Sequence, residues 1–126
     1  MEKKRSFSIK DRLQSFVYAF KGIAFIYKTE KNIYIHTFVT IMVIIMGFIL
    51  KVSKVEWCFL IISIGMVFTA EAFNTAIEHF IDFISPGYRY SAGKSKDMAA
   101  AAVLFAAITA AVVGLVIFLP KIIALF

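Results

Sequence analysis

The sequence predicts an all-α membrane protein: one domain, residues 1–126, built from three membrane-spanning helices and an N-terminal amphipathic helix at the membrane surface. Composition and the arrangement of the apolar residues support this fold class. Hydrophobic residues make up 61% of the chain and charged residues only 17%, so a water-soluble globule of this size would leave much apolar surface uncovered. The apolar residues also gather in three stretches of about 20 residues or more, the length that a helix needs to cross a bilayer.

The first predicted helix, residues 6–29, has apolar residues on one side only. From Ile9 onward these residues recur with the three- and four-residue spacing of an amphipathic helix, and Lys10, Arg12 and Lys21 lie on the other side. A helix with an apolar stripe and a basic face can lie flat between lipid and water, where its charges meet the headgroups. Packing of the stripe against a soluble partner is the alternative.

Two spanning helices are expected next. Residues 32–50 form an apolar run whose only ionisable member, His36, lies near its start, and the length suits one crossing of the membrane. The next apolar pattern, residues 55–84, makes a helix of about 45 Å at 1.5 Å per residue. Because the hydrocarbon core is only about 30 Å thick, this helix is expected to protrude into the cytoplasm.

The third spanning helix is expected at residues 98–119, after a turn and a loop. Pro86 and Gly87 end the second helix, residues 88–97 are expected to form the loop, and Pro120 ends the third helix. The many alanines of this third helix permit close approach of neighbouring helices.

The 14 Lys and Arg residues indicate the orientation of the chain. Most of them precede the first span or lie between the second and third spans, and few lie between the first and second spans or after the third. Because cytoplasmic segments of membrane proteins are enriched in Lys and Arg, the N-terminus and the loop before the third span are expected in the cytoplasm. The net charge of +6 is thus attributed to membrane orientation, and no nucleic-acid partner is predicted.

The stretch SAGKSKD, residues 91–97, contains the Gly-Lys-Ser triplet of a phosphate-binding P-loop. That motif requires two glycines separated by four residues between a strand and a helix. Here Gly87 and Gly93 are separated by five residues and a long helix precedes them, so a P-loop is rejected. Two alternatives remain: Ser95 and Asp97 cap the third span, or the lysines of this stretch bind phosphate beside a helix N-terminus.

The strongest functional signal lies within the second spanning helix, in residues 69–82. At about 100° per residue, three carboxylates and an amide fall on one helical face. An ionised side chain at the bilayer centre costs about 2.5 to 3.5 kcal/mol, so such a face requires water, cations or partner groups. A hydrocarbon core of about 20 residues ends between the first and second glutamates of this face. The four residues are Glu71, Asn74, Glu78 and Asp82.

The glutamates at different depths have different predicted roles. Glu71 and Glu78 lie about 10 Å apart along the helix axis, too far to bind one Mg²⁺ at about 2.1 Å. Glu78, on the aqueous side, is predicted to hold the Mg²⁺ of ATP, and Glu71, at headgroup depth, to accept the proton of a lipid hydroxyl. Glu30, just before the first span, is the candidate for a second metal ligand, with a solvated interfacial glutamate as the alternative. The two histidines, His36 and His79, lack partners at ligand spacing and are interpreted as packing or interfacial residues.

The motif E-x-x-N-[TS]-A-I-E-x-x-x-D, which runs from Glu71 to Asp82, is followed ten residues later by AGKSKD. In this combination the sequence resembles the small integral-membrane diacylglycerol kinase family of bacteria, which includes undecaprenol kinases. The similarity runs from YAFKG at Tyr18 through the third span. It implies a homotrimer with three spanning helices and a surface helix per subunit, active sites shared between subunits, MgATP as phosphoryl donor, and a place in the bacterial cytoplasmic membrane.

The resemblance also implies roles for individual residues. Glu71 matches the catalytic base, and Asn74 matches a polar residue beside the metal site. A basic residue expected near the start of the chain aligns with Asp11, so the neighbouring Arg12 is a candidate phosphate contact. Asp82 matches the family pattern, as either a structural or a catalytic residue. The implied metal ligands are Glu30 and Glu78, and the implied nucleotide contacts are Tyr18, Glu30, Glu78, Lys96 and Asp97.

Three functions are weighed from the sequence. The first is a lipid kinase that moves the γ-phosphoryl group of ATP to the hydroxyl of diacylglycerol, giving phosphatidic acid, or of undecaprenol, giving undecaprenyl phosphate, with Mg²⁺ as cofactor. The second is an ion-coupled membrane transporter, since carboxylates within membranes also mark ion pathways. The third is a structural membrane subunit whose polar face pairs helices. The family resemblance favours the kinase.

Overall fold

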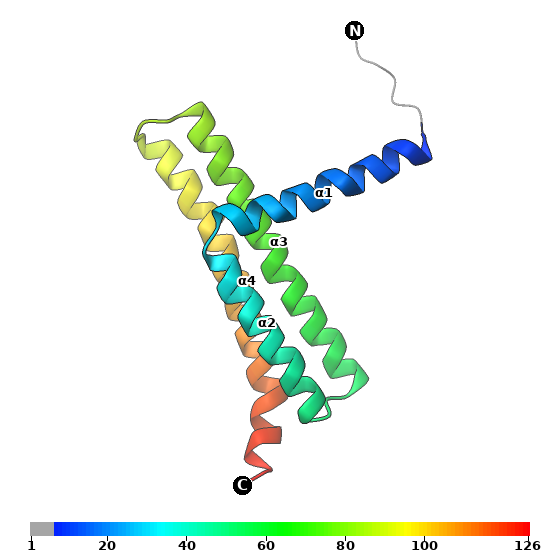
Figure 1. Ribbon diagram of the computed structural model, residues 1–126. Coiled ribbons are helices and arrows are strands. Elements are labelled where there is room, and N and C mark those ends of the chain that lie inside the picture. The colour runs from blue at the N-terminus through cyan, green and yellow to red at the C-terminus, as the bar shows by residue number, and fades with distance from the viewer. Residues whose placement is uncertain (1–6) are drawn as a thin grey trace.

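The computed structural model describes residues 7–126, which form four helices in the order α1 (Ile9–Thr29), α2 (Asn32–Ile49), α3 (Lys54–Ile84) and α4 (Tyr90–Ile123). That part of the chain contains no strand. Helices α2, α3 and α4 run side by side, and α1 projects from them at a steep angle (Figure 1). Each of the three is long and apolar enough to cross a membrane. The predicted all-α fold with three candidate spans is therefore confirmed, while residue 6, the expected start of the first helix, lies outside the described residues.

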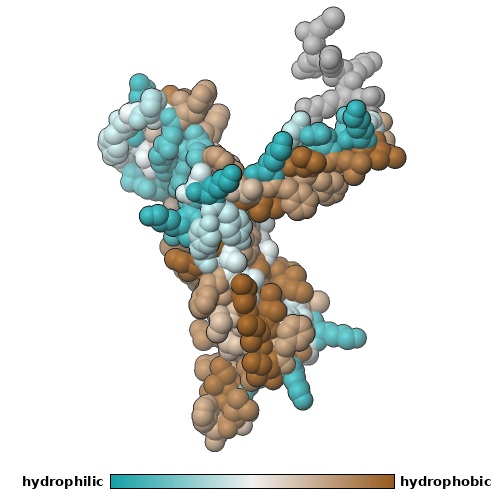
Figure 2. All heavy atoms as spheres, viewed as in Figure 1, coloured by the Kyte–Doolittle hydropathy of each residue, from teal (hydrophilic) through white to brown (hydrophobic). Residues whose placement is uncertain are grey.

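Helix α1 has a cap at each end. At its start the Ser8 hydroxyl accepts a hydrogen bond from the Asp11 backbone N–H at 3.3 Å, which satisfies one of the unpaired donors of the first turn. At its end Glu30 is extended, and its N–H donates to the Ile26 carbonyl at 2.8 Å. The helix has no buried residue, and polar atoms lie along one edge of it and apolar atoms along the other (Figure 2). Most of its apolar side is thus left uncovered by residues 7–126.

The turn between α2 and α3 reverses the chain within a few residues. Lys51 has a φ of 53°, in the left-handed region, and the Val52 N–H donates to the Gly47 carbonyl at 3.1 Å, a hydrogen bond that closes α2 as in a Schellman motif. Helix α3 then begins with a capping box, in which the side chains of Ser53 and Glu56 accept from each other's backbone N–H groups. These local hydrogen bonds set α3 beside α2.

Gly47 allows α2 and α3 to approach closely near this turn. It is buried, and a Cβ added to it would lie 2.8 Å from Cζ2 of Trp57 on α3. We therefore expect Gly47→Ala to destabilise the protein by about 1–3 kcal/mol, the usual cost of overpacking, measured as a lower midpoint of thermal unfolding in detergent. Gly65→Ala is the control, because a Cβ at Gly65 meets no atom within 4 Å. Equal losses in the two variants would contradict the packing role of Gly47.

The apolar core lies between α3 and α4, at the end of the bundle near the α2–α3 turn. The Lys121 ammonium on α4 donates to a carboxylate oxygen of Glu56 on α3 at 3.0 Å and joins the two helices at this end. Within residues 7–126, three of the four buried polar residues, Glu71, Asn74 and Thr75, lie instead in the C-terminal half of α3. The buried residues of the apolar core are Val52, Leu60, Ile117 and Phe118.

Helix α4 starts earlier than the sequence predicts. Residues 88–97 are expected to form a loop, but the helix begins at Tyr90. Residues 90–97 contain no proline, and their side chains interact one helical turn apart. Lys94 Nζ lies 5.4 Å from the centre of the Tyr90 ring, and the Ser95 hydroxyl donates to the backbone carbonyl four residues earlier at 3.0 Å. Ser95 and Asp97 therefore lie inside the helix and do not cap it.

The C-terminal end of α4 also differs from the expected one. Pro120 lies inside the helix, which continues to Ile123 and does not end at residue 119. Proline removes one backbone donor, but the following turn still closes, since the Ala124 N–H donates to the Pro120 carbonyl at 3.0 Å. This added turn contains Lys121, the partner of Glu56.

Candidate functional site

The polar residues of α3 differ in burial along one helical face. Glu71 is 2% exposed and Asn74 is 9% exposed, whereas Glu78 is half-buried and Asp82 is exposed. The face therefore runs from the interior of the bundle to its surface within about three turns of helix. Glu71 is the one large side chain that is fully buried within residues 7–126.

Glu71 is paired with a histidine of the neighbouring helix. His36 Nε2 on α2 lies 3.1 Å from Glu71 Oε1, and the His36 side chain is 21% exposed. From its sequence context His36 is interpreted as a packing or interfacial residue, whereas the structure places it against the predicted base. The periodicity of either segment does not reveal this contact. Membrane depth is the signal that could have found it, because His36 near the start of one span and Glu71 near the end of the next lie at one level.

Two buried oxygens beside Glu71 have no hydrogen-bond partner. Asn74 Nδ2 donates to Glu78 Oε1 at 3.3 Å, which leaves Asn74 Oδ1 buried without a partner among the described residues. Thr75 is 2% exposed, and its hydroxyl oxygen likewise has no partner there. Because buried polar atoms are almost always satisfied, these two oxygens are available to a ligand. Thr75 is uncharged and lies beside the acidic stripe, so the sequence pattern does not identify it.

Glu30 approaches the same region from the junction of α1 and α2. It is half-buried, and its pKa is raised, first by burial and then by the negative charges of Glu78 and Glu71, with partial opposition from His79. Glu30 thus lies close enough to both glutamates for their charges to repel it. His79 packs against the Phe25 ring of α1, with ring centres 5.1 Å apart, and this contact holds the end of α1 against α3.

The raised pKa of Glu30 makes its ionised form costly to the fold. Because the pKa is higher in the folded than in the unfolded chain, stability falls as the pH rises from the ordinary range of a carboxyl group through the raised value. We expect Glu30→Gln to remove this loss, so that the variant is more stable than the parent at about pH 7 without divalent cations, and that the difference shrinks at about pH 3. Thermal unfolding in detergent measures both differences. A variant less stable than its parent at neutral pH would contradict the repulsion.

A second group of predicted site residues lies where α3 ends and α4 begins. The Lys96 ammonium donates to the Asp82 carboxylate, and both side chains line a cavity of about 290 Å³ together with Asp97 and Arg89. Lys96 is half-buried and Asp82 is exposed, so the pair is open to water. Asp82 lies one helical turn beyond Glu78, which joins this cavity to the acidic face. The structure thus brings Asp82, Lys96 and Asp97 together. Lys96 and Asp97 lie on helix α4 and not on a loop.

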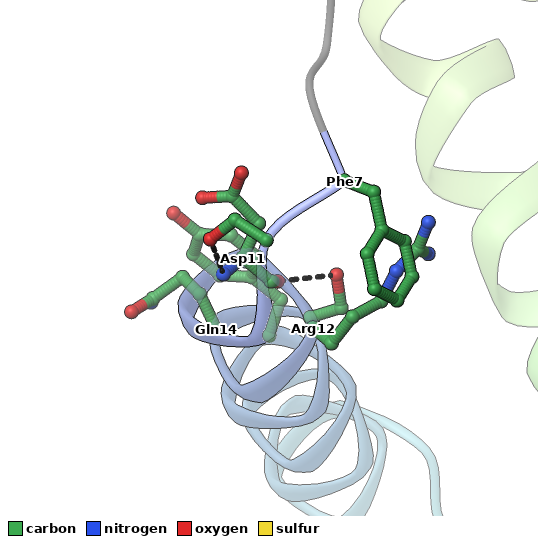
Figure 3. A pocket seen from close by; sticks show the side chains of 7 residues that line it. Phe7, Asp11, Arg12 and Gln14 are labelled. Carbon is green, nitrogen blue, oxygen red and sulfur yellow. Dashed lines mark hydrogen bonds between the residues drawn. The ribbon is translucent and has the colours of Figure 1, made fainter.

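Arg12 and Tyr18 lie apart from these residues, on the exposed surface of α1. Both line a hollow around the first turns of that helix, with Phe7 and Asp11. The Arg12 guanidinium lies 5.2 Å from the centre of the Phe7 ring, and Figure 3 shows these two side chains on one side of the helix and Gln14 on the other. Because α1 extends away from α3 (Figure 1), the structure does not bring Arg12 or Tyr18 to the acidic face of the same chain.

The fold and the site define a class of protein. Three apolar helices carry, toward one end of their bundle, a row of carboxylates, two unpartnered oxygens and a lysine. Oxygen donors of this kind suit a hard divalent cation, and a lysine beside them suits phosphate. The chain is therefore an integral membrane protein whose polar site suits a phosphate-bearing ligand.

Known proteins narrow this class to a family. Residues 17–118 match the family described as prokaryotic diacylglycerol kinase. The undecaprenol kinase of Bacillus subtilis is 41% identical over 108 residues, which cover 86% of this chain and 88% of that protein. The diacylglycerol kinase of Synechocystis sp. is 36% identical over 114 residues, 90% of this chain and 65% of that protein. The diacylglycerol kinase of Escherichia coli (strain K12) is 30% identical over 95 residues, 75% of this chain and 78% of that protein.

The chain belongs to the prokaryotic diacylglycerol kinase family. It is a multi-pass membrane protein of bacteria and an ATP-dependent lipid kinase. The family resemblance and the kinase interpretation of the sequence are thus confirmed. The matched residues include Tyr18, the acidic face of α3, Lys96 and Asp97, but not Arg12.

Proposed function

We propose that the protein transfers the γ-phosphoryl group of MgATP to the primary hydroxyl of undecaprenol, giving undecaprenyl phosphate. The observation that carries the reaction is the buried Glu71 on the same face of α3 as the half-buried Glu78. The choice of undecaprenol rests on the 41% identity to an undecaprenol kinase, against 36% and 30% to the two diacylglycerol kinases. Diacylglycerol, giving phosphatidic acid, is the second candidate acceptor, favoured by those same two relatives.

Glu71 is proposed as the base that accepts the proton of the lipid hydroxyl. Its Oε1 is engaged by His36 Nε2 at 3.1 Å, so its Oε2 is the oxygen that takes the proton. As the O–H bond breaks, the hydroxyl oxygen bonds to the γ-phosphorus, and the bond from that phosphorus to the β–γ bridging oxygen breaks to release ADP. A buried carboxylate suits this task, because water that would compete with the lipid hydroxyl is excluded.

Glu30 and Glu78 are proposed to hold Mg²⁺. Their carboxylates and the unpartnered Asn74 Oδ1 are the hard oxygen donors that this ion prefers. Within residues 7–126 no three Asp, Glu, His or Cys side chains converge closely enough to hold a metal by themselves, so phosphate oxygens of ATP are proposed to complete the coordination. When bound, Mg²⁺ neutralises charge on the transferring phosphoryl group. A cation between the carboxylates also relieves the repulsion that raises the pKa of Glu30.

The nucleotide is proposed to lie between Glu78 and the start of α4. Lys96 and Asp97 line the cavity there, and Lys96 is proposed to exchange the Asp82 carboxylate for a phosphate oxygen. Asp82 then has a supporting role, because it orients Lys96 while the site is empty. Glu30 and Glu78 contact the nucleotide through the ion that they hold.

A homotrimer with shared active sites is proposed to complete the site. Tyr18 and Arg12 lie away from the α3 face of their own chain. Helix α1 of a neighbouring subunit is proposed to supply Tyr18 to the nucleotide and Arg12 to a phosphate group.

The charge pattern supports one orientation in the bacterial cytoplasmic membrane. The N-terminus and the turn between α3 and α4 are proposed to face the cytoplasm, where ATP is found. Helix α1 is proposed to lie in the interface with its uncovered apolar side toward the lipid. Residues 1–126 then act as a single kinase domain.

Phosphoryl transfer to each lipid tests this proposal. The purified protein in mixed micelles receives labelled ATP and Mg²⁺, with undecaprenol or diacylglycerol in parallel. We expect labelled undecaprenol, with kcat/KM at least about tenfold above that for diacylglycerol. Label chiefly on diacylglycerol overturns the choice of acceptor, and no label on either lipid overturns the transfer. The transporter and structural-subunit alternatives, which the kinase relatives do not favour, predict that neither lipid is labelled.

A further inference from the structure

His36 is the hydrogen-bond partner of the Glu71 carboxylate within residues 7–126. It comes from α2, whereas the acidic face lies on α3 and Glu30 lies at the end of α1. The distance of 3.1 Å between Nε2 and Oε1 is that of a direct hydrogen bond. The contact therefore ties the orientation of this carboxylate to a second helix.

The chemistry of the pair fixes which atom donates. An ionised carboxylate, the form that a base needs, has only acceptors, so the hydrogen bond requires a proton on His36 Nε2. Glu71 is 2% exposed, and a buried charge without a donor is costly to the fold. The Nε2–H group therefore supports the charged carboxylate and holds one of its two oxygens in place.

The His36 ring has few polar neighbours apart from Glu71. The Thr40 hydroxyl donates to the His36 backbone carbonyl at 2.7 Å. His36 and Thr40 also line a cavity of about 350 Å³ between α2, α3 and α4, whose other lining residues are chiefly apolar. Because this cavity offers few competing polar partners, Glu71 is the favoured partner of the imidazole.

We propose that His36 is a positioning residue for the base. Its Nε2–H holds Glu71 Oε1, so that Glu71 Oε2 is directed at the acceptor hydroxyl. The inference rests on the proposed role of Glu71 as the base, and it adds a residue of α2 to the site. Orientation of this kind matters because a displacement of about 1 Å in a reacting group can lower the rate about 100-fold.

Steady-state kinetics of two His36 variants test the proposal. His36→Leu removes the hydrogen bond and puts an apolar side chain of comparable size in place of the imidazole. We expect its kcat to fall about 10- to 100-fold, while its KM for ATP changes by less than about twofold. His36→Gln restores a side-chain N–H that can reach Glu71, and we expect its kcat to lie within about fivefold of the parent value. Thr40→Val is the matched control, because it removes the hydroxyl bonded to the His36 carbonyl but no contact with Glu71. Its kcat is expected to stay within about twofold of the parent.

Each result decides for or against the positioning role. A parental kcat in His36→Leu overturns it, and so do equal losses in His36→Leu and His36→Gln, because the donor would then be irrelevant. An equal fall in Thr40→Val also overturns it, since the cavity would then be responsible. If His36→Leu does not elute like the parent in detergent, His36→Asn replaces it, because the shorter amide does not reach Glu71. Glu71→Gln in the same assay separates the role of Glu71 as the base from the positioning role of His36. An active Glu71→Gln variant overturns the role of the base. An inactive Glu71→Gln variant beside a fully active His36→Leu variant overturns only the positioning role of His36.

Discussion

Replacing Glu71 by Gln is expected to lower kcat by about 100- to 10,000-fold, the usual contribution of a general base. The substitution removes the proton acceptor but keeps the side-chain volume, and the amide oxygen can still accept from His36 Nε2. The fold and the affinity for ATP are therefore expected to remain. Label transfer from ATP to undecaprenol at saturating concentrations of both substrates measures kcat, and calorimetric titration with ATP measures the affinity.

Glu56→Gln is the matched control for this experiment. Glu56 lies at the other end of the same helix, where it pairs with Lys121 at 3.0 Å and accepts from the Ser53 N–H at 2.9 Å. Its replacement is expected to lower the stability only slightly and to leave kcat unchanged. A parental kcat in Glu71→Gln would refute the role of the base. Similar kcat losses in both variants would show instead that any disturbance of α3 lowers the rate.

Glu78→Gln is expected to raise the Mg²⁺ concentration for half-maximal activity by at least about tenfold. The amide is a weaker ligand than the carboxylate because it carries no charge, and Asn74 Nδ2, which donates to Glu78 Oε1 at 3.3 Å, loses a charged acceptor. Removal of Mg²⁺ from the parent with EDTA is expected to abolish transfer altogether. Titration of activity with Mg²⁺ at fixed total ATP measures both effects.

Two further variants serve as comparisons for the Mg²⁺ titration of Glu78→Gln. Glu30→Gln is expected to act in the same direction as Glu78→Gln, since both carboxylates are proposed ligands of one ion. Glu56→Gln is expected to leave the Mg²⁺ requirement unaltered. If the requirement of Glu78→Gln equals that of the parent, the metal site is misassigned even where kcat is lower.

Much of the fold follows from periodicity and length. The apolar runs and their boundaries predict residues 32–50 and 55–84 as helices, and the structure has Asn32–Ile49 and Lys54–Ile84. The start of α4 is harder to predict because residues 90–97 are polar and include a glycine, which favour a loop locally. Packing against α3 extends the helix through them, and tertiary contacts often override such local preferences.

The candidate site also has a part that the sequence predicts and a part that it does not. The acidic face of α3 is predictable because it depends on the geometry of a single helix. The contact of His36 with Glu71 does not follow from the periodicity of either helix, because it depends on how α2 lies against α3. The role of Arg12 is hardest to predict, because Asp11 occupies the aligned position and α1 extends away from the acidic face of its own chain.

In the proposed nucleotide site, the ion pair of Lys96 with Asp82 must open before the lysine can bind a phosphate. The lysine does not meet a ligand as a free charge, since its ammonium already donates to a carboxylate of its own chain. The two side chains are 38% and 62% exposed, so their separation costs about 0.2–1 kcal/mol. Opening the pair therefore lowers the affinity for phosphate by at most about fivefold, and the several charges of a triphosphate readily offset that cost. Asp82 thus keeps Lys96 in place near the proposed nucleotide site with little loss of affinity for ATP.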